Sequence, residues 1–359
     1  MSHDDIESFL RKRELSPRES EDMIKKKSAI SLLKFSCPQR RSDLFGKHEC
    51  NLLMIINEHF ELSSFERVAR YVRELDPRIS VAVVRDCTPM NLNLPNRFTL
   101  IFSPALIRNS PPIRGRMFCG EPLSKSEEYT ALGKAGIPVP QWVLLTEENS
   151  PDLSKFDDYV VRKPNYGGMG AKVVIIRKNR LRWKPVITEA AGLSRSTIVQ
   201  EFIYTGPRPV SYRVNTLFGK VLYSNKFEAS ANRPELTGPQ DFKSAVRQEG
   251  VSIAATARNS RAELNYDDEI IRLAESAHGA FPEIPLLGFD IIREAATGKL
   301  YVIEANAIGY VWWIETKDYG IPLEEQFDGL RKAAYILAEK TQELACQASL
   351  INKPPSGSH

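Results

Sequence analysis

Residues 287–306 read LGFDIIREAATGKLYVIEAN, two runs rich in β-branched residues joined by a short loop that contains Gly298. This pattern predicts a β-hairpin. If the loop is centred on Thr297, Asp290 lies opposite Glu304, because both are equally far from the turn. Directly opposed residues point to the same face of a sheet, and Asn306 shares that face because it lies two residues beyond Glu304. The hairpin therefore presents two carboxylates and an amide oxygen on one face.

The chemistry of this face favours a metal site. Carboxylates in an otherwise apolar hairpin are costly unless a positive charge meets them. Hard oxygen ligands at this spacing suit Mg²⁺, which proteins commonly hold through one or two carboxylates together with nucleotide phosphates. These residues alone leave open a second interpretation, in which they form the solvated outer face of an ordinary antiparallel hairpin.

The composition is that of a soluble globular protein. The chain has 359 residues, 42% hydrophobic and 26% charged, and this length predicts two or three domains or subdomains. The net charge of +4 is small, and no Lys/Arg run is interleaved with aromatic residues, so we expect no nucleic-acid partner. We also expect no membrane span, because no apolar run approaches the roughly 18 residues that one needs.

The predicted location is the cytoplasm. The charged N-terminus lacks the apolar core of a signal peptide. The five cysteines are scattered and form no CxxC pair, which argues against a disulfide framework or a zinc site and fits a reducing compartment.

The N-terminal third is predicted to contain an extension and a small domain. Residues 1–46 are polar and densely charged, and we expect an extension that is partly disordered or packed on the body, with a short helix near Ile30. A basic arm for an acidic partner is the alternative. Residues 47–112 predict a β-α-β domain, with strands at 51–57, 79–84 and 98–103 and a helix at 63–75. No glycine-rich turn follows its first strand, so we do not predict a dinucleotide site.

Residues 113–198 are predicted to form a second subdomain. A helix begins near Lys125 and runs to Lys134, with Ser124 or Ser126 as its N-cap. Strands are predicted at 142–145, 159–164 and 173–176.

A glycine-rich loop lies between the last two of these strands. It has three glycines in residues 167–170, so its backbone N–H groups are free to face an anion. A plain flexible hairpin tip is the alternative, but Lys163 on the preceding strand favours a phosphate site.

Residues 199–350 are predicted to form a third subdomain that includes the opening hairpin. A strand at 198–203 leads to a second hairpin, 210–217 and 221–227, which turns at Gly219 and carries Arg213 on its polar face. The remaining expectations are a loop at 228–262, helices at 267–280 and 323–348, and a disordered tail at 351–359.

The order of these motifs resembles the ATP-grasp superfamily, specifically its RimK-like amino-acid and peptide ligases. The motifs are the lysine helix ending in GIPVP, then VVRKPNYGGMG, VQEFI, the arginine strand, GFD and YVIEAN. The resemblance covers roughly residues 113–315. It implies an α/β (α+β) ATP-grasp fold, with the β-α-β unit as the preceding domain.

The resemblance implies a nucleotide site. It places Lys163 and Lys125 against the phosphates of ATP. The flap over these phosphates would be formed by Gly167, Gly168, Met169 and Gly170. The adenine edge would be contacted by the backbone of Glu201, Phe202 and Ile203. Ser211 stands where the family has an acidic residue for the ribose hydroxyls.

The resemblance also implies a metal site and catalytic residues. Asp290, Glu304 and Asn306 would be ligands of Mg²⁺, with Mn²⁺ as the alternative ion. Arg213 would steady a phosphate or an acyl intermediate, and Lys226 on the partner strand is a second candidate for that role. The family's proline-glycine after the asparagine is replaced by residues 307–310, and the two tryptophans that follow, Trp312 and Trp313, are expected in the core more than at a substrate.

The function that follows is an ATP-dependent ligase joining a carboxylate to an amine through an acyl phosphate. Its substrates would be small amino acids or peptides, and the sequence leaves a homo-oligomer open. The alternatives are an ATP-grasp kinase of small polyols and a non-catalytic nucleotide-binding protein. We expect Glu304→Ala to abolish turnover and to leave the fold largely intact, because removing one carboxylate relieves repulsion.

Overall fold

The computed structural model describes residues 49–86, 94, 96–107, 114–167, 172–188, 192–229, 260–308, 311–312, 324 and 327–351. The chain divides into two compact units, Met1–Phe45 and Gly46–His359, and every described residue belongs to the second. The predicted N-terminal extension, its helix near Ile30, and the tail after Ile351 therefore lie outside the described residues. None of the described helices is long and apolar enough to cross a membrane.

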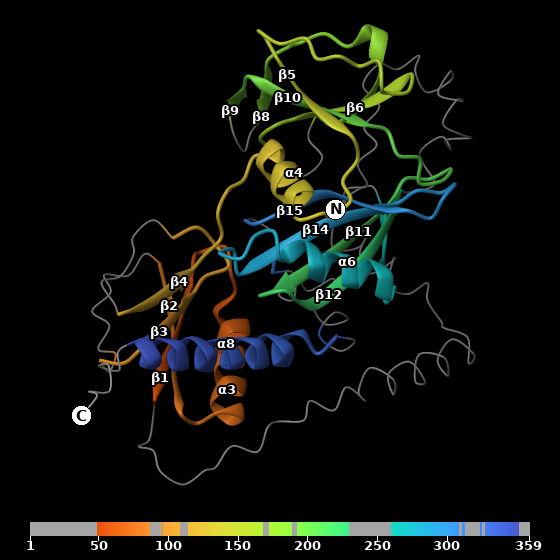
Figure 1. The fold of residues 1–359 in the computed structure, drawn as a ribbon. Helices are drawn as coiled ribbons and strands as arrows, with labels where there is room; N and C mark the ends of the chain where they lie inside the picture. The colour runs from red at the N-terminus through yellow and green to blue at the C-terminus, as the bar shows by residue number, and fades with distance from the viewer. Residues whose placement is uncertain are drawn as a thin grey trace, which may run out of the picture. The chain divides into compact units, whose positions relative to one another are not determined.

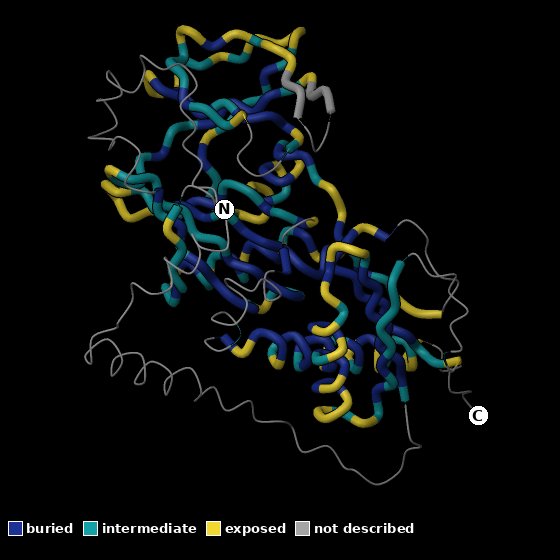
Figure 2. The backbone as a smooth tube through the Cα atoms, turned by 180° about the vertical axis from the view of Figure 1, so that it is seen from behind, coloured by how far each residue is buried: buried dark blue, intermediate teal, exposed yellow. Residues whose placement is uncertain are grey.

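The first sheet is parallel, with the strand order β2-β1-β3-β4 (Figure 1). Its strands are β1 (Cys50–Ile56), β2 (Ile79–Arg85), β3 (Thr99–Phe102) and β4 (Gly115–Phe118), and α3 (Leu62–Leu75) joins the first two. The predicted β-α-β unit is present. All of β1 is buried (Figure 2), as its continuous apolar run predicts. Strand β4 was not predicted, and because it pairs with β3 the sheet continues past residue 112, where the sequence placed the domain boundary.

The C-terminal helix α8 (Gly329–Ile351) packs against α3 and the first sheet (Figure 1). Leu337 of α8 shares a core cluster with Leu52 of β1 and Phe65 of α3. The sequence predicts this helix at 323–348, within the third subdomain of residues 199–350. Its buried stripe instead covers the first sheet, which only the tertiary structure reveals.

The second sheet is antiparallel, with the strand order β5-β10-β6-β7. Its strands are β5 (Trp142–Thr146), β6 (Tyr159–Pro164), β7 (Val174–Arg177) and β10 (Ser196–Glu201). The predicted subdomain boundary after residue 198 falls inside β10. Two further short strands, β8 (Val186–Thr188) and β9 (Gly192–Ser194), pair with each other, and a 3-10 turn, η1, spans Lys178–Arg180.

Helix α4 (Lys125–Lys134) precedes this sheet and starts in a capping box. The Ser124 side chain accepts a hydrogen bond from the Glu127 backbone N–H, and the Glu127 carboxylate accepts one from the Ser124 backbone N–H. Ser124, and not Ser126, is therefore the N-cap.

The third sheet is antiparallel, with the strand order β13-β12-β11-β14-β15. Its strands are β11 (Val210–Leu217), β12 (Lys220–Ala229), β13 (Ser260–Leu264), β14 (Leu286–Arg293) and β15 (Leu300–Asn306). Helix α6 (Asp268–His278) covers one face, where Ile270 and Ala274 pack against Phe289 and Ile291. Strands β12 and β13 extend into both ends of the loop predicted at 228–262, and residues 230–259 lie outside the described residues.

Strands β14 and β15 form the hairpin predicted from the sequence, and Asp290 pairs with Glu304. The register shifts by one residue next to Asp290, because Ile291 pairs with Val302 and leaves Ile303 as an extra residue. Without this bulge the ladder would place Glu304 opposite Phe289, on the core face. The predicted pairing is therefore correct, but a bulge produces it and not a loop centred on Thr297.

Candidate active site

Two rows of polar residues cross the face of the third sheet that α6 does not cover. Directly opposed residues share a face, so the strand register defines each row. The first row runs from β12 to β15 through Asn225, Arg213, Asp290 and Glu304. The second row runs through Tyr223, Asn215, Gly288 and Asn306.

Arg213 and Asp290 form a paired contact at the centre of the first row. Arg213 Nε donates to Asp290 Oδ1 at 2.5 Å and Nη2 donates to Oδ2 at 2.8 Å. The two side chains are only 17% and 19% exposed, so this is not a solvated outer face. Gly288 leaves room for the arginine, because a Cβ there would lie 3.2 Å from both Arg213 Cδ and Asn215 Nδ2. The chain thus uses a glycine to seat a buried guanidinium.

Lys125 meets the other carboxylate of the row. Its Nζ lies 2.7 Å from Glu304 Oε1 and donates to the Gly167 carbonyl at 2.8 Å. Asn165, at the end of β6, holds the start of α4 in place, since its backbone and side-chain oxygens accept from the backbone N–H groups of Lys125 and Ser126, both at 2.9 Å. Helix α4 and strand β6 therefore deliver this lysine to the third sheet.

Lys163 is buried beside the bulge in β15. Its Nζ donates to the Ile303 carbonyl at 2.9 Å and to the Tyr129 hydroxyl at 2.6 Å. The Tyr129 hydroxyl also lies 2.6 Å from Gln200 Oε1. The extra residue of the bulge thus supplies the carbonyl that anchors this lysine.

The electrostatics keep Glu304 ionised among cations. Burial acts to raise the pKa of Glu304, but the charges of Lys125 and Lys163 outweigh it and hold the pKa below its ordinary value. Burial raises the pKa of Asp290, and Arg213 opposes this only in part. Burial lowers the pKa of Lys163 to about 8. Lys125, Lys163 and Arg213 therefore place positive charges where an anionic ligand can bind.

Three residues of this cluster were missed in the sequence: Glu128, Tyr129 and Gln200. Glu128 is buried and accepts from the Ala305 backbone N–H at 2.9 Å, and burial together with Glu304 raises its pKa to about 8. A signal existed for the first two, because they lie three and four residues after Lys125 and so share its helix face. Gln200 gave no such signal.

The structure does not bring Lys226 to this site. Lys226 pairs with Tyr212, and both lie on the face opposite to Arg213 and Asn225. Its Nζ lies 3.4 Å from Glu228 and 4.0 Å from Glu263. The expectation of a role like that of Arg213 was wrong, because a one-residue offset along a strand reverses the face.

The residues predicted to contact adenine lie at and just after the end of β10, and the residue predicted to contact the ribose lies on β11. Glu201 ends β10, where its backbone N–H donates to the Gln141 carbonyl at 2.8 Å. Ile203 is buried with Ile292 and Tyr301, and Phe202 lies between it and the strand. Ser211 shares the face of Arg213. Of the predicted flap, Gly167 is described, while Gly168, Met169 and Gly170 lie outside the described residues.

Asp290, Glu304 and Asn306 offer only oxygen ligands. Asn306 Nδ2 donates to the Gly288 carbonyl at 3.0 Å and to Asp290 Oδ2 at 3.4 Å, so its amide oxygen is the atom to offer a metal. Within the described residues no three His, Cys, Asp or Glu side chains are grouped to hold an ion. A metal here would therefore use this Asp-Glu-Asn set with ligands from outside the protein. All-oxygen donors fit Mg²⁺ or Mn²⁺.

Polar groups remain unpaired beside the site. Asn225 Nδ2 and Asn215 Oδ1 are buried without a hydrogen-bond partner among the described residues, although Asn215 Nδ2 donates to the Val311 carbonyl at 2.5 Å. Trp312 stacks on Phe65 with ring centroids 4.9 Å apart, so it is a core residue as predicted. Trp313 lies outside the described residues.

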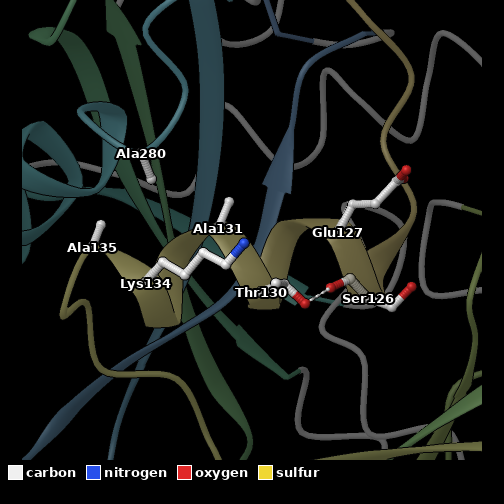
Figure 3. A pocket seen from close by; sticks show the side chains of 7 residues that line it. All are labelled: Ser126, Glu127, Thr130, Ala131, Lys134, Ala135 and Ala280. Atoms are coloured by element: carbon white, nitrogen blue, oxygen red, sulfur yellow. Dashed lines mark hydrogen bonds between the residues drawn. The ribbon is translucent and has the colours of Figure 1, made fainter.

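A separate depression of about 620 Å³ lies along the outer side of α4 (Figure 3). It is lined by Ser126, Glu127, Thr130, Ala131, Lys134, Ala135 and Ala280. Within it Thr130 Oγ1 donates to the Ser126 carbonyl at 2.7 Å. None of the predicted site residues lines it, and Lys125 lies on the buried side of the helix.

Comparison with protein-family models identifies the family to which this fold and this order of site residues belong. A family model described as "ATP-grasp domain" matches residues 123–307, more than half of the chain. The chain therefore belongs to the ATP-grasp family, and its fold is a mixed α/β ATP-grasp fold.

The chain also matches individual solved structures at low sequence identity. No curated protein sequence matches the chain. D-alanine–D-alanine ligase from Bacillus anthracis is 12% identical, over 82% of this chain and 99% of that chain, with a TM-score of 0.46. D-cycloserine synthetase DcsG is 15% identical, over 81% and 99%, with a TM-score of 0.46. The ATP-grasp ligase PsnB, solved with a precursor variant, Mg and ADP, is 14% identical, over 80% and 98%, with a TM-score of 0.47.

Proposed function

We propose that this protein is an ATP-dependent carboxylate–amine ligase of the RimK-like kind, releasing ADP and phosphate. The observation that supports this most is the charge arrangement in the first polar row. Lys125 meets Glu304 at 2.7 Å, Arg213 meets Asp290 at 2.5 Å, and Lys163 lies buried next to them. Cations and carboxylates held on one sheet face suit the transfer of a phosphoryl group.

The proposed reaction has two steps. A carboxylate oxygen of the first substrate attacks the γ-phosphorus of ATP, the bond from that phosphorus to the β-phosphate oxygen breaks, and ADP leaves. The nitrogen of the amine substrate then attacks the acyl carbon, phosphate leaves with both electrons of the C–O bond, and the nitrogen loses a proton. Water must be kept out because it would hydrolyse the acyl phosphate.

Individual residues have distinct tasks in this proposal. Lys125 and Lys163 bind phosphate oxygens of ATP, and Arg213 stabilises charge on the transferring group. Asp290, Glu304 and Asn306 would hold Mg²⁺ or Mn²⁺, which when bound neutralises charge on the phosphate oxygens. The segment Glu201–Ile203 is assigned to the adenine edge and Ser211 to the ribose.

The test is ADP release from Mg²⁺-ATP in pools of amino acids and short peptides, followed by mass spectrometry. We expect a product lighter by one water than the sum of two substrates. A product heavier by one phosphoryl group would identify the kinase alternative, and nucleotide binding without ADP in any pool would favour the non-catalytic one. Either result would overturn the ligase.

Two lysine variants give a matched control for the site. Lys163→Met should abolish ADP release, because it removes a buried cation next to Glu304. Lys226→Met should retain it, because Lys226 lies on the opposite face of the sheet. An equal loss of ADP release in both variants would mean that the activity does not depend on the sheet face that carries Arg213, Asp290 and Glu304.

A further inference from the structure

Helix α4 lies against strand β15 at the edge of the third sheet (Figure 1). Because β15 ends the strand order, its outer backbone groups have no neighbouring strand among the described residues. Buried backbone N–H and C=O groups still need partners, since an unpaired one costs free energy. Side chains of α4 supply two of these partners, so the helix takes the place of a strand at this edge.

The two contacts hold β15 on either side of Glu304. On one side, the Tyr129 hydroxyl lies 2.9 Å from the Ile303 carbonyl oxygen. On the other side, the Glu128 carboxylate accepts from the Ala305 backbone N–H at 2.9 Å. Glu128 and Ala305 are only 4% and 1% exposed, so water cannot easily replace the second bond. One helix therefore restrains both chain neighbours of Glu304.

Ala305 lies between the two proposed metal ligands of β15, Glu304 and Asn306. A rotation of the Ala305 peptide would move both ligands. The strand ladder restrains this segment less than usual, because the bulge at Ile303 interrupts the pairing just before it. Mg²⁺ demands near-octahedral geometry with oxygens about 2.0–2.1 Å away, so a small displacement of either ligand weakens its binding.

We propose that Glu128 is a positioning residue of the metal site. Its hydrogen bond holds the Ala305 peptide, and this peptide fixes the distance between the side chains of Glu304 and Asn306. The proposal rests on the proposed function, because the metal belongs to the nucleotide site of that function. Glu128 acts through the backbone and touches neither metal nor ATP. The helix that carries it is fixed at its start by the capping box and by Asn165.

Two substitutions separate the hydrogen bond of Glu128 from its charge. Glu128→Gln keeps an acceptor oxygen at the same reach and loses the negative charge. Glu128→Asp keeps the charge but is one methylene shorter, so its carboxylate does not reach the Ala305 N–H. Positioning through the hydrogen bond predicts that Glu128→Gln retains metal binding and that Glu128→Asp loses it. A role as counter-charge for the lysines alone predicts the opposite.

Glu275→Asp is the matched control. Glu275 lies on α6, and its Oε1 accepts from the Val221 backbone N–H of β12 at 2.9 Å. The same shortening therefore breaks the same kind of helix-to-strand bond, at a residue outside both polar rows. Thermal unfolding without ligand reports the general cost of this change. Both aspartate variants should lower the melting temperature, because each leaves a backbone N–H without its partner.

Metal binding is measured by calorimetry on the full chain, as the dissociation constant of ADP in EDTA divided by that in excess Mg²⁺. Wild-type protein, Glu128→Gln and Glu275→Asp should share one ratio above one. In Glu128→Asp the ratio should fall about tenfold, while the dissociation constant in EDTA stays near that of the wild-type protein. A general loss of structure would instead weaken both constants alike and leave the ratio unchanged.

Three results would overturn the assignment: an unchanged ratio in Glu128→Asp, an equally reduced ratio in Glu128→Gln, or no effect of Mg²⁺ on ADP binding in the wild-type protein. If Glu128→Asp does not fold, a retained ratio in Glu128→Gln supports the hydrogen bond and a lost one overturns it.

The ligase itself is judged separately, by ADP release and product mass. A ratio that depends on Glu128 without any ligation would contradict the proposed reaction and support the positioning role. Ligation together with an unchanged ratio in Glu128→Asp would do the reverse.

Discussion

Glu304 is held by cations more than it is repelled by carboxylates. Lys125 lies 2.7 Å away, and Lys163 is the second charge that lowers the Glu304 pKa. We expected Glu304→Ala to leave the fold largely intact because it would relieve repulsion between carboxylates. That reason is wrong, because the attraction of the two lysines is the larger effect on Glu304. Removing this carboxylate leaves buried lysines without their counter-charge, and that is a costly change.

We expect Glu304→Ala to lower the free energy of unfolding by about 3 kcal/mol, measured by urea denaturation without nucleotide or metal. Glu283→Ala is the control, because its partner Arg116 is 46% exposed and Glu283 itself 66% exposed. That variant should change stability by less than about 0.5 kcal/mol. Equal stability of the two variants would mean that the buried pair contributes nothing.

His278 gives a pH prediction outside the site. Burial lowers the pKa of His278 to about 4, against 6.5 when it is exposed, and the Ile284 carbonyl opposes this only in part. As the pH falls, His278 therefore binds a proton in the unfolded chain before it does so in the folded protein. The stabilisation that the neutral His278 side chain gives to the folded state is fully present above pH 6.5. It is lost as the pH falls to about 4, which lowers the free energy of unfolding by about 3 kcal/mol.

The check is urea denaturation of wild-type protein and His278→Gln between pH 4 and 6.5. The wild-type protein should lose more stability over this range than the variant. His59→Gln, at an exposed position, should follow the wild-type curve. Parallel curves for the wild-type protein and His278→Gln would contradict the prediction.

At the scale of elements, β11 and β14 depend on a close approach at Gly288. A Cβ there would lie 3.2 Å from Arg213 Cδ, tighter than ordinary contact, and the arginine cannot withdraw without breaking its pair with Asp290. We expect Gly288→Ala to displace Arg213, to reduce ADP release at least tenfold, and to cost about 1–3 kcal/mol of stability.

The control for this element is Gly133→Ala in α4. Nothing lies within 4 Å of a Cβ at Gly133, and alanine favours a helix, so this variant should gain about 0.5–1 kcal/mol and keep its activity. Both stabilities follow from urea denaturation. A fully active Gly288→Ala would show that Arg213 does not need this space.

At the scale of the molecule, one core cluster joins distant parts of the chain. It contains Leu52 of β1, Phe65 of α3, Tyr223 of β12, Leu286 of β14 and Leu337 of α8. Helix α8 thus packs against β1, the first described strand, and also against the sheet that carries the polar rows. Loss of its packing should therefore affect the described body as a whole.

We expect Leu337→Ala to cost about 2–5 kcal/mol, because the side chain is fully buried. Fluorescence and circular dichroism should show one shared unfolding transition. Leu350→Ala, in the same helix but 67% exposed, should change stability by less than about 0.5 kcal/mol. Two separate transitions in Leu337→Ala would contradict a shared core.

Much of the local structure could be predicted. The helix from Lys125 to Lys134, strand 159–164 and the hairpin with Arg213 follow from local hydrophobic patterns, caps and turn residues, which depend on nearby residues alone. Strand β4 was missed because it is short and largely exposed, and Lys226 was misplaced because a one-residue offset reverses a strand face.

The sequence by itself determined most of the elements and the family resemblance, and it predicted the pairing of Asp290 with Glu304 from a loop that the structure does not have. Only the tertiary structure decided that a bulge at Ile303 produces this pairing and anchors Lys163, that Glu128 and Tyr129 join the cluster, and that α8 belongs to the first sheet. The physical reason is distance along the chain. Lys125 and Glu304 are 179 residues apart, and no local pattern specifies which buried charge meets which.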